Sequence, residues 1–194
     1  MLPAETTPHY PRTRGIALSA LFATLLAIFS LITIPLPFSP VPITLQVLIV
    51  FLIVNLLGPY FGTLACIIYL LFGSIGLPVF AGATAGPAVI FGPLGGYLVA
   101  FPLAALVGGS LVRKRAKTKK SDTLRVVLAT AISLAIIYFV GVVWLSEFYN
   151  WSLSQGFEAG ALPFIPIDGA KAVLAVPVSV YFRWARTDLP IHRK

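Results

Sequence analysis

Two ionisable side chains lie close together near the start of the last apolar stretch of the sequence. Asp168 and Lys171 are three residues apart, a spacing that places both on one face of a helix. A carboxylate accepts hydrogen bonds and an ammonium group donates them, so the pair could bind a polar group that offers both kinds of partner. An ion pair that only neutralises itself would have the same spacing. Because charged side chains in apolar spans are costly and usually mark function, we predict a polar binding site here.

The composition around this pair is typical of a membrane protein. Of the 194 residues, 58% are hydrophobic and 10% are charged, whereas soluble domains carry about 25% charged residues. No Asp, Glu, Lys or Arg occurs between Gly15 and Val112. Uncharged apolar runs of about 20 residues are typical of membrane-spanning helices. We therefore expect a multi-pass protein of the cell membrane.

The order of apolar runs and breaks predicts an all-α fold with six transmembrane helices. Four prolines in residues 35–42 predict a loop, because proline interrupts the hydrogen bonds of a helix. The pair Gly58-Pro59 predicts a tight hairpin between two short helices, and residues 147–162 are expected to form a polar loop. The six helices are predicted at 16–34, 43–57, 61–72, 92–112, 124–145 and 163–184.

The basic residues predict how these helices are oriented. Every Lys and Arg except Lys171 lies beside an end of an apolar run, and positive charge beside a span marks its cytoplasmic side. Six spans bring both termini to that side, whereas five would leave the basic C-terminus outside. We expect a membrane domain over 15–186, between a polar tail (1–14) and a basic tail (187–194). This distribution also accounts for the net charge of +8 without a nucleic acid partner.

The sequence lacks the motifs of several functional classes. It has no G-x-x-x-x-G-K-[ST] phosphate-binding loop and no H-E-x-x-H zinc motif. The single cysteine, Cys66, provides neither a disulfide framework nor a cysteine metal site. We expect no metal and no cofactor, and a transporter is favoured over an enzyme. A membrane-embedded enzyme that uses Asp168 as an acid or base, or a purely structural protein, is the alternative.

Two further segments are rich in small residues. Residues 73–96 contain seven glycines, three prolines and no charge, which suits either close helix packing or an irregular loop over a pocket. Ser19, Ala23 and Ala27 recur every four residues in the first apolar run. Such a stripe lets another helix approach closely, and spacing alone favours a helix of the same bundle.

Several motifs that follow one another in order make the sequence similar to the BioY family. The similarity extends over residues 16–185. The motifs are Pro40-Val41-Pro42-Ile43-Thr44-Leu45-Gln46, Gly58-Pro59, Gly73-Ser74-Ile75-Gly76-Leu77-Pro78-Val79-Phe80-Ala81-Gly82, Gly92-Pro93-Leu94-Gly95-Gly96-Tyr97, Phe101-Pro102 and Pro163-Phe164-Ile165-Pro166, followed by Asp168-x-x-Lys171. BioY proteins are the biotin-binding S components of energy-coupling factor (ECF) transporters.

This resemblance implies a six-helix, S-component-like bundle that binds biotin with high affinity for uptake. A separate transmembrane coupling subunit and two ATPase subunits would supply the energy. It further implies that Asp168 and Lys171 bind the ureido ring of biotin, Asp168 accepting from its N–H groups and Lys171 donating to its carbonyl oxygen. The opposite assignment, with Lys171 on the valerate carboxylate, stays open, as does an S component for another vitamin.

The resemblance also suggests further contact residues. Thr44, Gln46, Phe80, Thr84 and Tyr97 are predicted to line the biotin site, with Thr84 in a loop where some family members have an asparagine. Loops 35–42 and 76–92 are expected to close over the ligand.

The small-residue stripe of the first helix resembles the surface with which S components meet the coupling subunit. Ser19, Ala23 and Ala27 therefore become candidates for that interface.

Overall fold

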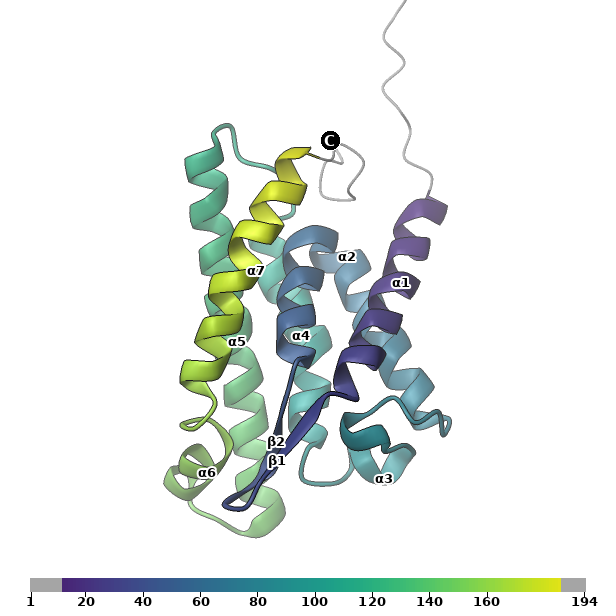
Figure 1. Cartoon of the computed structure of the whole chain (residues 1–194), viewed down its shortest axis with the longest axis vertical. Helices are drawn as coiled ribbons and strands as arrows, with labels where there is room; N and C mark the ends of the chain where they lie inside the picture. The colour runs from purple at the N-terminus through teal and green to yellow at the C-terminus, as the bar shows by residue number, and fades with distance from the viewer. Residues whose placement is uncertain (1–11, 186–194) are drawn as a thin grey trace, which may run out of the picture.

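The computed structural model describes residues 12–185, which form a bundle of helices with one two-stranded β-sheet (Figure 1). The predicted tails fall outside these residues, except for the first three residues of α1. The elements are α1 (Arg12–Ser30), β1 (Thr33–Leu36), β2 (Ser39–Thr44), α2 (Gln46–Ser74), the 3₁₀ turn η1 (Ala81–Ala83), α3 (Pro87–Ile90), α4 (Gly95–Leu111), α5 (Lys119–Tyr149), α6 (Leu153–Gly160) and α7 (Ile165–Ala185).

The long helices of the described chain are apolar enough to cross a membrane. Four of them, α1, α2, α5 and α7, have the required length and hydropathy, and α4 is a shorter apolar helix. In Figure 1, α1 begins, α7 ends and α4 connects to α5 at one end of the bundle, while the β-hairpin, α3 and α6 lie at the other. The short elements of the described chain therefore gather at one end of the bundle.

The helix α2 contains a sharp break at the predicted Gly58-Pro59 hairpin. Gly58 has a φ of 69° and a ψ of −167°, a conformation that glycine adopts without the strain of a side chain. A methyl group placed on Gly62 would lie 3.2 Å from the Ile53 side chain, although nine residues of straight helix would separate them by about 13 Å. The chain therefore reverses at Gly58, and α2 consists of two arms that pack against each other.

The loop predicted at residues 35–42 is wrong, because these residues belong to a β-hairpin. β1 and β2 pair antiparallel, with Thr33 opposite Thr44, and the register shifts at Pro35. Proline is tolerated in edge strands and at bulges, and both strands of a two-stranded sheet are edges. As a result α1 ends before the predicted boundary at residue 34.

The polar loop predicted at residues 147–162 also contains regular structure. The helix α6 begins in it with a capping box, in which Gln155 Oε1 accepts from the Ser152 backbone N–H at 2.9 Å and Ser152 Oγ accepts from the Gln155 N–H at 3.3 Å. Such reciprocal bonds satisfy two otherwise unpaired donors of a helix start. Gly160, the last residue of α6, lines the cavity described below.

The small-residue stripe of α1 packs inside the bundle. Ser19 and Ala23 are buried and Ala27 is half-buried, and Ser19 Oγ donates to the Phe61 carbonyl oxygen of α2 at 2.8 Å. Small side chains let α1 and α2 approach closely. The spacing of the stripe alone favours such a neighbour within the same bundle. The contact with a coupling subunit that the resemblance suggests for Ser19, Ala23 and Ala27 stays a prediction.

A buried ion pair joins four helices at the end where α7 finishes. Arg183 Nε and Nη2 donate to Asp122 Oδ2 and Oδ1, each at 2.8 Å, and both side chains are fully buried. Arg183 Nη1 also donates to the carbonyl oxygens of Asn55 at 2.8 Å and Val112 at 3.1 Å. The sequence pattern alone places Arg183 among the basic residues that flank a span. The structure corrects this, because a position near a helix end does not reveal a buried counter-charge.

We predict that Asp122→Asn strongly destabilises the protein, because it leaves the Arg183 guanidinium buried without its counter-charge. Breaking a buried pair in this way costs about 3–5 kcal/mol, which corresponds to about 6–20 °C in melting temperature for a chain of this size. Thermal unfolding of the purified protein in detergent measures the change. Glu147→Gln, at an exposed acid of the same helix, is the control, and equal melting of the two variants would contradict the prediction.

Candidate ligand-binding site

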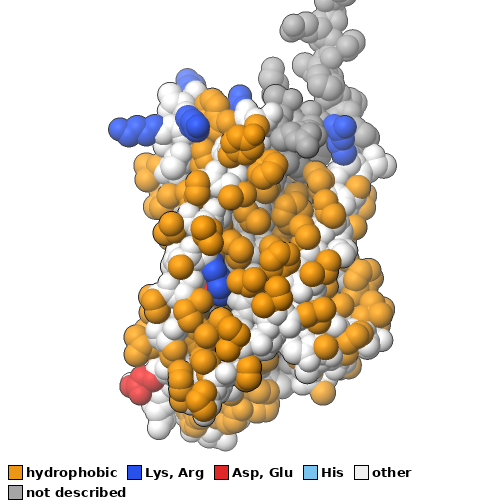
Figure 2. Space-filling model, in the orientation of Figure 1, with side chains coloured by type: hydrophobic (Ala, Val, Ile, Leu, Met, Phe, Trp, Pro, Cys, Tyr) orange, Lys and Arg blue, Asp and Glu red, His pale blue; other side chains and the backbone are white. Residues whose placement is uncertain are grey.

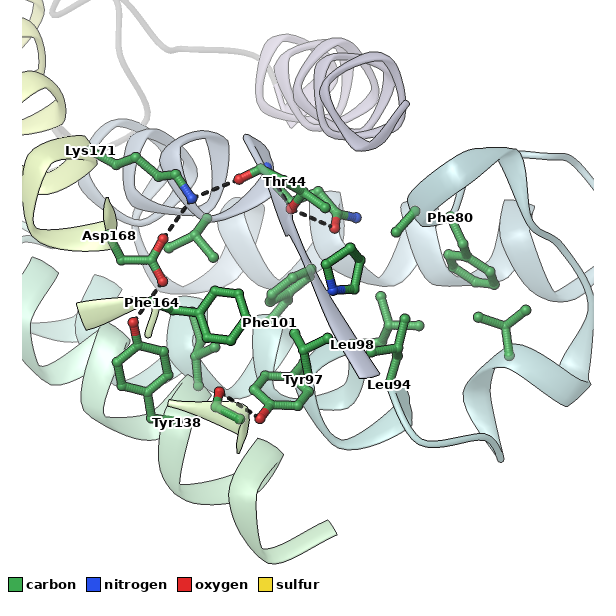
Figure 3. A pocket seen from close by; sticks show the side chains of 18 residues that line it. Thr44, Phe80, Leu94, Tyr97, Leu98, Phe101, Tyr138, Phe164, Asp168 and Lys171 are labelled. Atoms are coloured by element: carbon green, nitrogen blue, oxygen red, sulfur yellow. Dashed lines mark hydrogen bonds and ion pairs between the residues drawn. The ribbon is translucent and has the colours of Figure 1, made fainter. Parts of the chain in front are cut away.

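A cavity opens at the end of the bundle that holds the β-hairpin, α3 and α6 (Figure 3). The enclosed part of the cavity has a volume of about 60 Å³, and the empty space reaches about 640 Å³ when the open solvent at its mouth is included. Most of its walls are apolar, as is typical of small-molecule sites. The largest apolar side chains in the walls are Phe80, Leu94, Leu98, Phe101, Ile137 and Phe164.

The predicted pair Asp168 and Lys171 lies in this cavity and is tied to two neighbouring elements. Lys171 Nζ lies 2.6 Å from Asp168 Oδ1 and donates to the carbonyl oxygen of Thr44, also at 2.6 Å. Asp168 Oδ2 accepts from Tyr138 Oη at 2.7 Å. Because Thr44 belongs to β2 and Tyr138 to α5, the pair connects the hairpin, α5 and α7.

The local sequence explains why the pair has this geometry. α7 begins at Ile165, and Pro166 in its first turn is compatible with a helix start, where no backbone N–H is required. Asp168 follows in the first turn, where the helix dipole favours a negative charge. Lys171 lies one turn later on the same face, and both side chains are less than a tenth exposed. The spacing seen in the sequence therefore produces a buried, oriented pair.

Two further predicted residues form a hydrogen-bonded group beside the pair. Thr44 Oγ1 donates to Gln46 Oε1 at 3.1 Å, and Gln46 Nε2 donates to Tyr69 Oη at 2.6 Å. Thr44 and Gln46 both line the cavity. The second N–H of the Gln46 amide stays available for a ligand, since each amide nitrogen carries two donors.

The aromatic candidates contribute ring surface to the cavity. Phe80 is fully buried and packs edge-on against Tyr69, with ring centroids 5.5 Å apart. Tyr97 Oη donates to the Gly160 carbonyl oxygen at 2.8 Å, so its hydroxyl is bonded to α6. Thr84 does not line the cavity: it is exposed, and its hydroxyl donates to the Ala81 carbonyl oxygen at 3.0 Å. Of the predicted binding residues, Thr84 alone lies outside the cavity lining.

Tyr138 is a residue of the site that sequence reasoning missed. It lies in the middle of a long apolar run, where a single tyrosine has no spacing partner that points to a site. Its hydroxyl is the bond partner of the second Asp168 oxygen. The only sequence feature that distinguishes Tyr138 is that no other tyrosine occurs in the predicted helix 124–145.

Comparison with known proteins identifies the fold and the family. The sequence model of the BioY family matches residues 4–188. The chain belongs to the BioY family. Two relatives are similar over nearly their whole length. The "Probable biotin transporter BioY" of Pyrococcus horikoshii is 38% identical over 168 residues, 87% of this chain and 95% of the relative. The "Biotin transporter BioY" of Thermotoga maritima is 39% identical over 168 residues, 86% and 94% of the two chains.

A solved structure has the same fold as this BioY chain. It is the crystal structure of "the S-component for biotin from an ECF-type ABC transporter", with a TM-score of 0.78 and 31% sequence identity. The similarity covers 89% of this chain and 92% of the other. Members of this family are transport proteins and not enzymes, so the alternative of Asp168 as a catalytic acid or base is removed.

We predict that the two charges of the cavity depend on each other for stability. Lys171→Met leaves the Asp168 carboxylate buried without a counter-charge, at a cost of about 3–5 kcal/mol. The double variant Asp168→Asn with Lys171→Met removes both charges and should melt at a higher temperature than Lys171→Met alone. Thermal unfolding of both variants without ligand tests this. A double variant that melts no higher than Lys171→Met would show that the two charges do not depend on each other in the folded protein.

Proposed function

We propose that this BioY chain is a high-affinity biotin-binding S component that mediates biotin uptake. The observation that carries the proposal is the buried Asp168–Lys171 pair, held by Tyr138 and Thr44 at one end of an apolar cavity. Support comes from the relatives, which are named as biotin transporters, and from the shared fold with a biotin S component.

Biotin presents chemistry that matches both parts of the cavity. Its ureido ring has two N–H donors and one carbonyl acceptor. In our proposal Asp168 accepts from the N–H groups and Lys171 donates to the carbonyl oxygen, as charge-assisted hydrogen bonds. The thiophane ring and aliphatic chain then lie against the apolar walls, with Phe80 and Tyr97 among them. Thr44 and Gln46 flank the polar end.

We further propose six membrane crossings with both termini in the cytoplasm. The two antiparallel arms of α2, together with α1, α4, α5 and α7, supply six helical segments. Lys and Arg side chains gather at the end where α1 begins and α7 ends, and an acidic side chain lies at the opposite end (Figure 2). The band between them is apolar on this face except for one basic side chain. This polarity agrees with a cytoplasmic basic end in a lipid bilayer. The cavity then lies toward the outer side.

The proposed mechanism includes partner subunits. The chain has no phosphate-binding loop of its own, so we propose that a transmembrane coupling subunit and two ATPase subunits supply the energy of transport. The hairpin contributes Val41 and Pro42 to the cavity, and the segment after α2 contributes Ala81 and Val89. The β-hairpin that contains residues 35–42 and the segment 76–92 are therefore well placed to close over biotin.

Calorimetric titration of biotin into the purified protein tests this function. We expect nanomolar affinity, with Asp168→Asn and Lys171→Ala each weakening it at least tenfold, about 1.4 kcal/mol. Glu158→Gln, at an exposed acid near the same end, should leave the affinity unchanged. Absence of binding in folded protein would refute biotin as the ligand, and tighter binding of another vitamin in competition would favour that vitamin.

Tyr138→Phe should weaken biotin binding about five- to tenfold, about 1–1.4 kcal/mol. The variant keeps the ring but removes the hydroxyl that orients Asp168 Oδ2, so the carboxylate can rotate away from the ligand. The matched control is Tyr181→Phe, at a tyrosine that is 66% exposed on α7. The same calorimetric titration measures both, and an affinity equal to that of the control would contradict the role of Tyr138.

A further inference from the structure

The charges of the cavity cancel before any ligand enters. Among the described residues that line it, Asp168 and Lys171 are the only acid and the only base, and the ammonium nitrogen lies 2.6 Å from the carboxylate oxygen. Both side chains are buried. The site is thus polar but electrically neutral, which restricts the charge of the group that can bind beside it.

The hydrogen-bonding capacity left in the pair suits an uncharged group. Lys171 donates two of its three N–H bonds, to Asp168 and to the Thr44 carbonyl oxygen. Each Asp168 oxygen has one partner, Lys171 or Tyr138, and retains a lone pair. A urea group can accept the remaining Lys171 N–H and donate its own N–H to Asp168 without adding charge.

A carboxylate at the same place would be unfavourable. It would put two anions around the single ammonium group of Lys171 and leave one negative charge uncompensated. In a buried site an uncompensated charge costs several kcal/mol. The electrostatics therefore separate the two orientations of biotin that the sequence leaves open: the ureido ring belongs at the pair, and the valerate carboxylate belongs elsewhere.

Among the described residues, those that line the far side of the cavity include no base that could pair with the carboxylate. Figure 3 shows Phe80 and Leu94 away from Asp168 and Lys171, and both are apolar. Ala81 and Val89 line the cavity from the η1–α3 segment, residues 81–90. Both side chains are half-buried, and several of their neighbours in this segment are exposed. A chain that extends from the pair toward this segment brings its terminal group to the more accessible part of the cavity, where water can solvate it.

We infer that the negative charge of the biotin tail contributes little to binding, so that this protein also takes neutral tail derivatives of biotin. The ligand class is then an intact ureido-thiophane ring system with a short chain that ends in either a carboxylate or an uncharged amide. This inference rests on the proposed biotin function and deepens it, because it states which part of the ligand is recognised.

Competition against radiolabelled biotin on the purified wild-type protein tests this inference. Biotinamide replaces the carboxylate by a neutral group of the same size, and diaminobiotin keeps the carboxylate but lacks the ureido carbonyl. We expect biotinamide to bind within tenfold of biotin and diaminobiotin to bind at least a hundredfold more weakly. Biotinamide more than tenfold weaker than biotin would overturn the inference, as would diaminobiotin within tenfold of biotin.

The same experiment separates this inference from the proposed function. If labelled biotin itself does not bind to folded protein, the biotin function fails. If biotin binds and biotinamide does not, the biotin function stands and the charge-neutral recognition fails. No variant is needed, so loss of folding cannot be mistaken for either result.

Discussion

A charge buried in an apolar helix bundle requires its counter-charge within hydrogen-bonding distance, and this constraint determines where α7 lies. α7 carries two buried cations, Lys171 and Arg183, each paired with an acid. Each cation also binds a backbone carbonyl near one end of the first arm of α2, at Thr44 and at Asn55. The distance between the cations along α7 is about 18 Å, close to the length of that arm. The two helical segments are therefore held side by side at both ends.

The two buried cations of α7, one near each end, differ in how much hydrogen-bonding capacity they leave for a ligand. At Arg183 the guanidinium group has a bidentate carboxylate and two carbonyl partners, which leaves little capacity for a ligand. At Lys171 one N–H is unused, and the pair borders a cavity with apolar walls. The pair has no net charge, so a ligand with a neutral polar head and an apolar body can bind there without leaving a buried charge uncompensated.

Much of this arrangement could be predicted from the sequence. The uncharged apolar runs, the Gly58-Pro59 break and the Asp168-x-x-Lys171 spacing each reflect local rules, and the structure contains all three features. The prolines of residues 35–42 do not reveal the hairpin, because proline interrupts helices but is also tolerated in edge strands. Arg183 and Tyr138 were missed because their partners, Asp122 and Asp168, are distant in sequence. No local pattern encodes such contacts. The same limit applies to the stripe on α1, since spacing cannot tell an internal neighbour from a partner subunit.

The most direct test of the central claim is an experimental structure of this BioY chain with biotin bound. We predict that the ureido oxygen lies within hydrogen-bonding distance of Lys171 Nζ and that a ureido N–H donates to Asp168. The valerate carboxylate should lie away from both, toward the η1–α3 segment. A carboxylate bound to Lys171, or biotin seated outside the cavity, would contradict it.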